Sequence, residues 1–281
     1  MKHQEGFFKG IRGANIYYQS WLPESEPRAA LLIVHGLAEH SGRYGNVVNH
    51  FVPLGYAVYG IDHFGHGKSD GKRVYVKRFS DYTNTLKVYF GMIREWQPDK
   101  PIFLVGHSMG GLIGTVYLLD HQAELAGAVL SGPAVKIPKH VTPTMLFVGK
   151  ILSALIPRFG LLPLDAVGVS RDPLVVKAYV SDPLVYRGKA TARLAAEMIK
   201  AMQTISGQAA RITLPIMIVQ GSADRLVNPA GARMLYDAVS SADKEIRIYD
   251  GLYHEVFNEP EQDKVLRDIE IWLEVHLGSR K

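Results

Sequence analysis

Leu104-Val105-Gly106-His107-Ser108-Met109-Gly110-Gly111 joins a short apolar run to a helix-like pattern. Residues 102–105 are expected to form a strand, and the helical pattern at 112–119 follows directly. The spacing Gly-x-Ser-x-Gly predicts a sharp turn with a serine at its apex and glycines where side chains would collide with the neighbouring strand and helix. So tight a turn predicts a positive φ at Ser108 and a hydroxyl at a helix N-terminus, where the partial positive charge favours a developing anion. A glycine-rich turn with an incidental serine is the alternative.

The composition is that of a globular chain. Its 281 residues, 47% of them hydrophobic, suffice for one large α/β domain or two small ones. The net charge is +5, and the lysines and arginines are scattered along the chain without a long run, so we expect no nucleic-acid partner. The absence of cysteine removes disulfides, thiolate metal sites and a cysteine nucleophile. Residues 1–10 lack a secretory signal and no run of about 18 apolar residues occurs, which favours a cytoplasmic location.

Strands and helices alternate along most of the chain. Short, continuously apolar runs are typical of strands buried on both faces of a sheet, and they occur at 29–34, 56–61, 101–105, 127–130 and 214–219. Amphipathic patterns such as 79–96 predict helices between them. The pattern indicates an α/β fold with a doubly wound, mostly parallel sheet, whose sites lie at the carboxyl ends of the strands.

The alternation breaks between about Ala134 and Ser206, where no convincing strand is predicted. We therefore expect a core at 1–133, a helical cap at 134–206 inserted after the sixth strand, and the rest of the core at 207–281. Within the cap, Asp172-Pro173 and Asp182-Pro183 are each predicted to form a turn that begins a helix.

A nucleophilic serine needs a base, and the base needs a carboxylate that fixes its tautomer. Chains with such an elbow carry these groups in the order Ser, then Asp or Glu, then His. Ser108, Asp224 and His254 satisfy that order, and each directly follows a predicted strand. We predict them to be the catalytic residues at one edge of the sheet. A surface histidine placed after the last strand by coincidence is the alternative.

The anion formed in such a reaction needs two backbone N–H donors. Met109, which follows the nucleophile, and Leu37, in the loop after the strand that ends at Val34, are the predicted oxyanion-hole residues. An ordinary His-Gly strand end is the alternative for the second position. Just beyond it, Glu39, His40 and Arg43 fit either a solvated helix start or a group that binds a polar head group.

The stretch Asp62-His63-Phe64-Gly65-His66-Gly67 has a spacing that could bind a metal. Its glycines favour a tight loop in which polar side chains bond the backbone, and the ligand set is incomplete. We expect neither a metal nor a cofactor.

With these residues in place, the chain resembles the monoacylglycerol lipases of the α/β-hydrolase superfamily. The resemblance rests on the stretches 35–44, 62–71, 106–111, 181–184 and 221–226 and covers nearly the whole chain except the hydrophobic part of the cap. It implies a serine hydrolase that cleaves a monoacylglycerol to glycerol and a fatty acid through an acyl-enzyme. It also implies a polar substrate-binding pocket formed by Glu39, Arg43, Tyr179 and His254. Family members often carry cysteines near the site, and this chain has none.

The hydrophobic part of the cap, 141–164, contains only Lys150 and Arg158 as charged residues and is interrupted by three prolines. It is too interrupted to span a bilayer. Its apolar residues either pack onto the core or line an acyl tunnel and lie on a membrane surface. We expect transient, peripheral membrane contact through this segment.

Other functions stay open on the same scaffold. One is a broader carboxylesterase or lysophospholipase, and another is a catalytically silent, hydrolase-like binding protein. A cofactor-free haloperoxidase is also compatible with the residues. A haloalkane dehalogenase is disfavoured because that chemistry requires a carboxylate at position 108. The sequence does not predict the oligomeric state.

Overall fold

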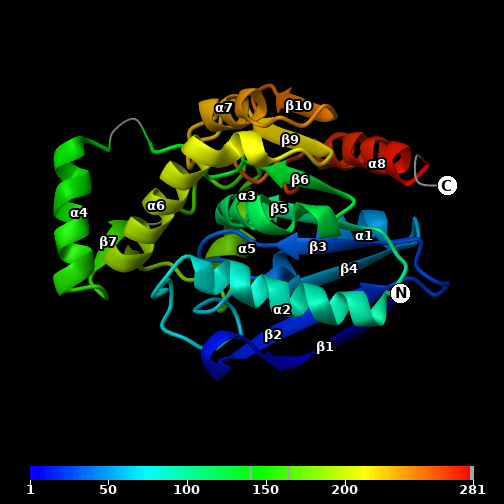
Figure 1. Ribbon diagram of the computed structural model, residues 1–281, viewed down its shortest axis with the longest axis horizontal. Helices are drawn as coiled ribbons and strands as arrows, with labels where there is room; N and C mark the ends of the chain where they lie inside the picture. The colour runs from blue at the N-terminus through cyan, green and yellow to red at the C-terminus, as the bar shows by residue number, and fades with distance from the viewer. Residues whose placement is uncertain (139–140, 164, 279–281) are drawn as a thin grey trace.

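An eight-stranded sheet with the order β1-β2-β4-β3-β5-β6-β9-β10 forms the centre of the molecule (Figure 1). The computed structural model describes residues 1–138, 141–163 and 165–278. The strands of the sheet are β1 (Lys2–Lys9), β2 (Asn15–Leu22), β3 (Ala29–Val34), β4 (Tyr56–Ile61), β5 (Ile102–His107), β6 (Gly127–Ser131), β9 (Ile216–Gly221) and β10 (Lys244–Tyr249). Only the β1–β2 and β2–β4 pairs are antiparallel, so the predicted mostly parallel sheet is confirmed.

Helices cover both faces of this sheet. The helices are α1 (Gly45–Phe51), α2 (Ser80–Trp96), α3 (Met109–His121), α4 (Pro143–Leu155), α5 (Pro173–Ser181), α6 (Ala192–Gln208), α7 (Ala230–Ala238) and α8 (Gln262–Gly278). Alternate residues of β3 point to opposite faces: Leu32 packs in the layer with α2, α3, α6 and α7, while Leu31 packs with α1 and α8. Burial on both faces explains why the strands are continuously apolar in sequence.

The turn between β5 and α3 has the strain that its sequence predicts. Ser108 adopts φ 54° and ψ −118°. A β-carbon at Gly110 would lie 1.9 Å from the carbonyl oxygen of Val34 in β3, and one at Gly106 would lie 2.7 Å from the carbonyl oxygen of Gly110. The chain can pass between its neighbours only because both positions lack a side chain. The serine is thereby held at the first turn of α3.

The segment after β6 differs from the expectation in two places. It contains a short two-stranded sheet, β7 (Gly160–Pro163) and β8 (Lys189–Thr191), where no strand was predicted. Strands of four and three residues are too short to show an alternating pattern. Asp172 caps α5 as predicted, but Asp182-Pro183 does not begin a helix; the Asp182 carboxylate accepts from the Leu184 N–H and closes a turn.

Two helices of this segment lie very differently. In Figure 1, α4 stands apart from the sheet and contacts α6, whereas α6 also packs against α3 of the core. Within the described part of the chain, no helix combines the length and apolar character needed to cross a bilayer. The division of the chain at residues 134–206 stays a proposal, and we use "cap" for that segment below.

The N-terminal strand β1 was also not predicted. It pairs with β2 along its whole length, from Lys2 opposite Leu22 to Lys9 opposite Asn15. Most of its side chains are exposed because it is the outermost strand of the sheet. Its sequence therefore lacks the apolar pattern that identifies the buried strands.

Candidate active site

The predicted reactive residues gather around the elbow at the carboxyl ends of the parallel strands. Ser108 ends the turn after β5, and its N–H donates to the carbonyl of Ser131 at the end of β6. The ring of the preceding residue, His107, lies 4.6 Å from the ring of His254, centroid to centroid. Since His254 follows β10 and Asp224 follows β9, residues far apart in sequence meet at one edge of the sheet.

Asp224 and His254 form a buried hydrogen-bonded pair. The distance from His254 Nδ1 to Asp224 Oδ2 is 2.7 Å. The Asp224 carboxylate also accepts from the N–H groups of Leu226 and Val227 and from the Gln220 amide. Although burial favours the neutral acid, the charge and hydrogen bond of His254 outweigh it and lower the pKa of Asp224. An ionised carboxylate only accepts, so Nδ1 carries the hydrogen and Nε2 is left as the basic nitrogen.

The same pair adjusts the basicity of the histidine. Burial alone would lower the pKa of His254, but the charge and hydrogen bond of Asp224 more than compensate and raise it above its ordinary value. His107, beside it, behaves in the opposite way, because burial, with a smaller contribution from His254, lowers its pKa to about 4. His107 is therefore neutral near pH 7 and does not oppose a positive charge on His254.

The two predicted oxyanion donors are available. Neither Leu37 N–H nor Met109 N–H donates to a protein acceptor among the described residues. The loop that carries Leu37 turns sharply, since the next residue, Ala38, has φ 66°. A β-carbon at Gly36 would lie 3.1 Å from the Ser108 β-carbon, which places this loop directly beside the serine.

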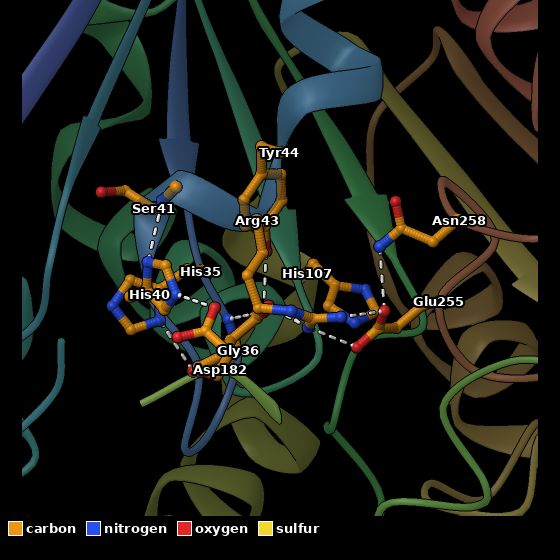
Figure 2. A network of polar contacts seen from close by, with 12 residues as sticks. His35, Gly36, His40, Ser41, Arg43, Tyr44, His107, Asp182, Glu255 and Asn258 are labelled. Atoms are coloured by element: carbon orange, nitrogen blue, oxygen red, sulfur yellow. Dashed lines mark hydrogen bonds and ion pairs between the residues drawn. The ribbon is translucent and has the colours of Figure 1, made fainter. Parts of the chain in front are cut away.

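Arg43 is the centre of a buried network behind this loop (Figure 2). Its guanidinium donates to Glu39 at 2.8 Å and, through two nitrogens, to both carboxylate oxygens of Glu255 at 2.6 and 2.8 Å. Glu255 also accepts from Asn258, and Glu39 accepts from the Tyr44 hydroxyl. Burial favours the neutral form of Glu255, but the charge and hydrogen bonds of Arg43 prevail and hold its pKa well below its usual range.

The residues that the resemblance assigns to a polar pocket are thus partly engaged with one another. Arg43 lies 4.5 Å from the ring centroid of Tyr179 on α5, within the range of a cation–π contact. Glu39, Arg43 and Tyr179 therefore form one contiguous group of buried side chains. Their part in substrate binding stays a prediction.

His40 lies at a contact between the loop that carries Leu37 and the cap. Its Nε2 donates to Asp182 at 2.8 Å, while its Nδ1 accepts from the Gly42 N–H. Nearby, the Tyr186 N–H donates to the carbonyl of Ala38 at 2.8 Å. The Asp182 turn, where a helix was expected, thereby fastens the cap to the loop that carries Leu37.

The Asp62–Gly67 stretch forms a tight loop in which the acid bonds the backbone. Asp62 accepts from the N–H and hydroxyl of Ser41 and from the N–H of Lys68. His63 and His66 are buried, and desolvation lowers the pKa of His66 to about 3. No group of metal-ligating side chains with suitable geometry occurs among residues 1–138, 141–163 and 165–278.

Sequence reasoning missed Glu255, the residue that joins Arg43 to the loop of His254. A signal was present, since a carboxylate directly follows the predicted base. Its partner Arg43 is 212 positions away, so the contact itself could not be predicted from spacing. Asn258, which supports Glu255, was missed for the same reason.

Alternating strands and helices with a strained serine elbow at the centre of the sheet define the α/β-hydrolase fold. The groups gathered at its carboxyl edge are those used by serine hydrolases.

Comparison with known proteins supports this assignment to the serine hydrolases. The profile of the family described as serine aminopeptidase, S33 matches residues 25–261. The chain is 43% identical to a monoacylglycerol lipase of Mycolicibacterium smegmatis over 97% of this chain and 98% of that protein. It is 33% identical to human monoglyceride lipase over 93% and 87% of the two chains. The crystal structure of Paleococcus ferrophilus monoacylglycerol lipase superposes with a TM-score of 0.81 at 32% identity, covering 98% and 100% of the chains. The chain belongs to this serine hydrolase family and, within it, to the monoacylglycerol lipases.

Proposed function

We propose that this protein hydrolyses monoacylglycerols to glycerol and a free fatty acid, with Ser108 as the nucleophile. The hydrogen-bonded Asp224–His254 pair beside the Ser108 elbow is the observation that supports the chemistry. The substrate class is supported by membership of the monoacylglycerol lipase family.

The proposed reaction has two steps. His254, held by Asp224, takes the proton of Ser108 as the serine oxygen attacks the ester carbonyl. The N–H groups of Leu37 and Met109 bind the oxyanion, and glycerol leaves with the proton from His254. Water activated by the same histidine then releases the fatty acid and restores the serine. No cofactor takes part.

The glycerol part of the ester is proposed to lie near Glu39, Arg43, Tyr179 and His254. The proximity of Arg43 to Tyr179 supports a common polar side of the site. Because Arg43 is already paired with Glu39 and Glu255, an approaching polyol would meet a charged group that is fixed in place.

An activity panel tests the substrate. Monoacyl, diacyl and triacyl glycerols, lysophospholipids and p-nitrophenyl esters of increasing chain length are compared at equal enzyme concentration. We expect kcat/KM to be highest for monoacylglycerols, about 5- to 150-fold above the diacyl compounds, because a buried polar group that discriminates between alcohols contributes about 1–3 kcal/mol. Equal rates on monoacylglycerols and lysophospholipids would favour the broader esterase instead.

The cap is proposed to touch a lipid surface transiently. Many of its large apolar side chains are exposed, among them Met145, Phe147, Val148, Ile151, Leu155, Ile156, Phe159 and Leu162. So many exposed apolar side chains in one segment are typical of a binding face. Lys150 and Arg158 in the same segment can reach lipid phosphates.

Phe147→Ser and Leu155→Ser test this contact, since these side chains are 65% and 75% exposed. Each is expected to weaken co-sedimentation with anionic liposomes roughly 5- to 10-fold, because less apolar area enters the interface. Ile271→Ser on α8, where the side chain is 53% exposed, is the matched control and should bind like the parent. Unchanged binding of both cap variants would contradict the proposal.

A further inference from the structure

The Arg43 guanidinium joins two loops that both serve the proposed reaction. Glu39 lies in the loop after β3, which carries the candidate donor Leu37, and Glu255 directly follows the candidate base His254. Arg43 donates to both carboxylates, and the three side chains are only 5–9% exposed. Figure 2 shows Arg43 reaching Glu255, which Asn258 holds from the other side. The network thus connects the oxyanion donor with the base through charged, buried groups.

Gly36, just before the donor, is held at both of its polar groups. Its N–H donates to Glu39 at 2.6 Å, and its carbonyl accepts from His35 Nδ1 at 2.8 Å. His35 can donate there because its Nε2 accepts from the His63 N–H at 2.9 Å. The Gly36 carbonyl and the Leu37 N–H belong to one planar trans peptide and point in opposite directions. The His35 contact therefore fixes the direction in which Leu37 N–H points, while the Glu39 contact fixes the N–H side of Gly36, the residue that carries this peptide.

We infer that Glu255 is a positioning residue. Through Arg43 and Glu39, it holds the Leu37 N–H at a fixed position relative to His254. The inference rests on the proposed function, because it assumes that Leu37 and His254 serve the same reaction. A displacement of a catalytic group by about 1 Å can lower the rate on the order of 10²-fold. A network that fixes the two loops relative to each other therefore supports a high kcat.

The charges of the network also suit the reaction. Two carboxylates share one guanidinium, which leaves a net negative charge beside a histidine that becomes positive in the transition state. The carboxylates whose negative charges act on His254 are Asp224 from the β9 loop, Glu255 from its own loop and Glu39 from the β3 loop. The fourth titratable neighbour, His107 from β5, is neutral near pH 7. Removing the charge of Glu255 should therefore make the imidazolium harder to form.

Glu255→Gln tests the inference with little change in size. With a p-nitrophenyl ester we expect kcat to fall about 10- to 100-fold, less than the full loss of an oxyanion donor, while KM changes by less than about threefold. The acid limb of the kcat/KM profile should move to lower pH, because a negative charge that favours protonated His254 is gone. Glu255→Asp keeps the negative charge but loses the bidentate contact with Arg43. The acid limb of its kcat/KM profile should therefore stay in place while kcat still falls.

Glu259→Gln is the matched control. Glu259 is an equally buried carboxylate four residues further along, and it accepts from the backbone N–H and side chain of Arg171. Its replacement should lower Tm but leave kcat and the acid limb unchanged. The Glu39→Gln/Glu255→Gln double variant should lose less than the product of the single losses, because both residues act through Arg43.

The inference is overturned if Glu255→Gln resembles Glu259→Gln, with a lower Tm but parental kcat and acid limb, or if the two glutamate losses simply multiply. The proposed function is judged separately on the parent protein. A parent that cleaves the p-nitrophenyl ester but no monoacylglycerol refutes the proposed substrate, and the variant-to-parent ratios still decide the role of Glu255.

Discussion

Ser108→Ala is expected to lower kcat for monoacylglycerol hydrolysis by about 10⁶-fold, because no other group can form the acyl-enzyme. The residual rate should still exceed the uncatalysed rate, since the N–H groups of Leu37 and Met109 and the binding site remain. Steady-state hydrolysis with product quantified by chromatography measures the loss.

The variant should fold normally. Alanine keeps the β-carbon, so the strained backbone at φ 54° is unchanged and only the hydroxyl is removed. An unchanged Tm and circular dichroism spectrum are therefore the controls for this experiment. Undiminished turnover in a folded Ser108→Ala variant would refute the assignment of the nucleophile.

Asp224→Asn is expected to lower kcat by about 10⁴-fold at neutral pH while leaving the fold intact. Asparagine can still accept from the N–H groups of Leu226 and Val227, but its amide then faces His254. His254 must then accept from that amide through Nδ1, so its hydrogen moves to Nε2. Nε2 is the nitrogen that Ser108 requires as a base, and with the hydrogen it can no longer act as one.

The pH dependence of kcat/KM gives an independent test with the same variant. The catalytic form of His254 is neutral, so activity is lost as the pH falls through its pKa. Asp224 raises that pKa against the opposing effect of burial. Without the carboxylate, the residual activity should therefore persist to lower pH than in the parent. Asp250→Asn, in the neighbouring loop where Asp250 bonds Ser222, is the control and should keep the parental rate and profile. An acid limb that moves to higher pH in Asp224→Asn would contradict the assignment.

The central strands and the elbow could be predicted because each is encoded locally. A strand buried on both faces requires a continuous apolar run, and the β5–α3 turn requires glycine at positions 106 and 110, where a β-carbon would overlap backbone atoms. The edge strand β1 has no such requirement, because solvent covers most of its side chains. The β7 and β8 strands, of four and three residues, are too short to show a pattern. Their sequences therefore carry no distinctive pattern.

In the candidate site, too, some residues could be predicted from the sequence and others could not. Ser108, Asp224 and His254 could be nominated because each follows a strand in a fixed order. The environment of Arg43 could not, since its second carboxylate comes from a loop 212 positions away. The family resemblance implied a pocket for the substrate, and the structure adds that the same arginine links the loop of Leu37 to the loop of His254.

The most direct test of Ser108 as the nucleophile is reaction of the protein with a fluorophosphonate, followed by peptide mass spectrometry and assay of the remaining monoacylglycerol hydrolysis. We expect one phosphonyl group per chain, located on Ser108, and activity that falls in proportion to the labelled fraction. Label on another residue, or full activity after complete labelling of Ser108, would contradict it.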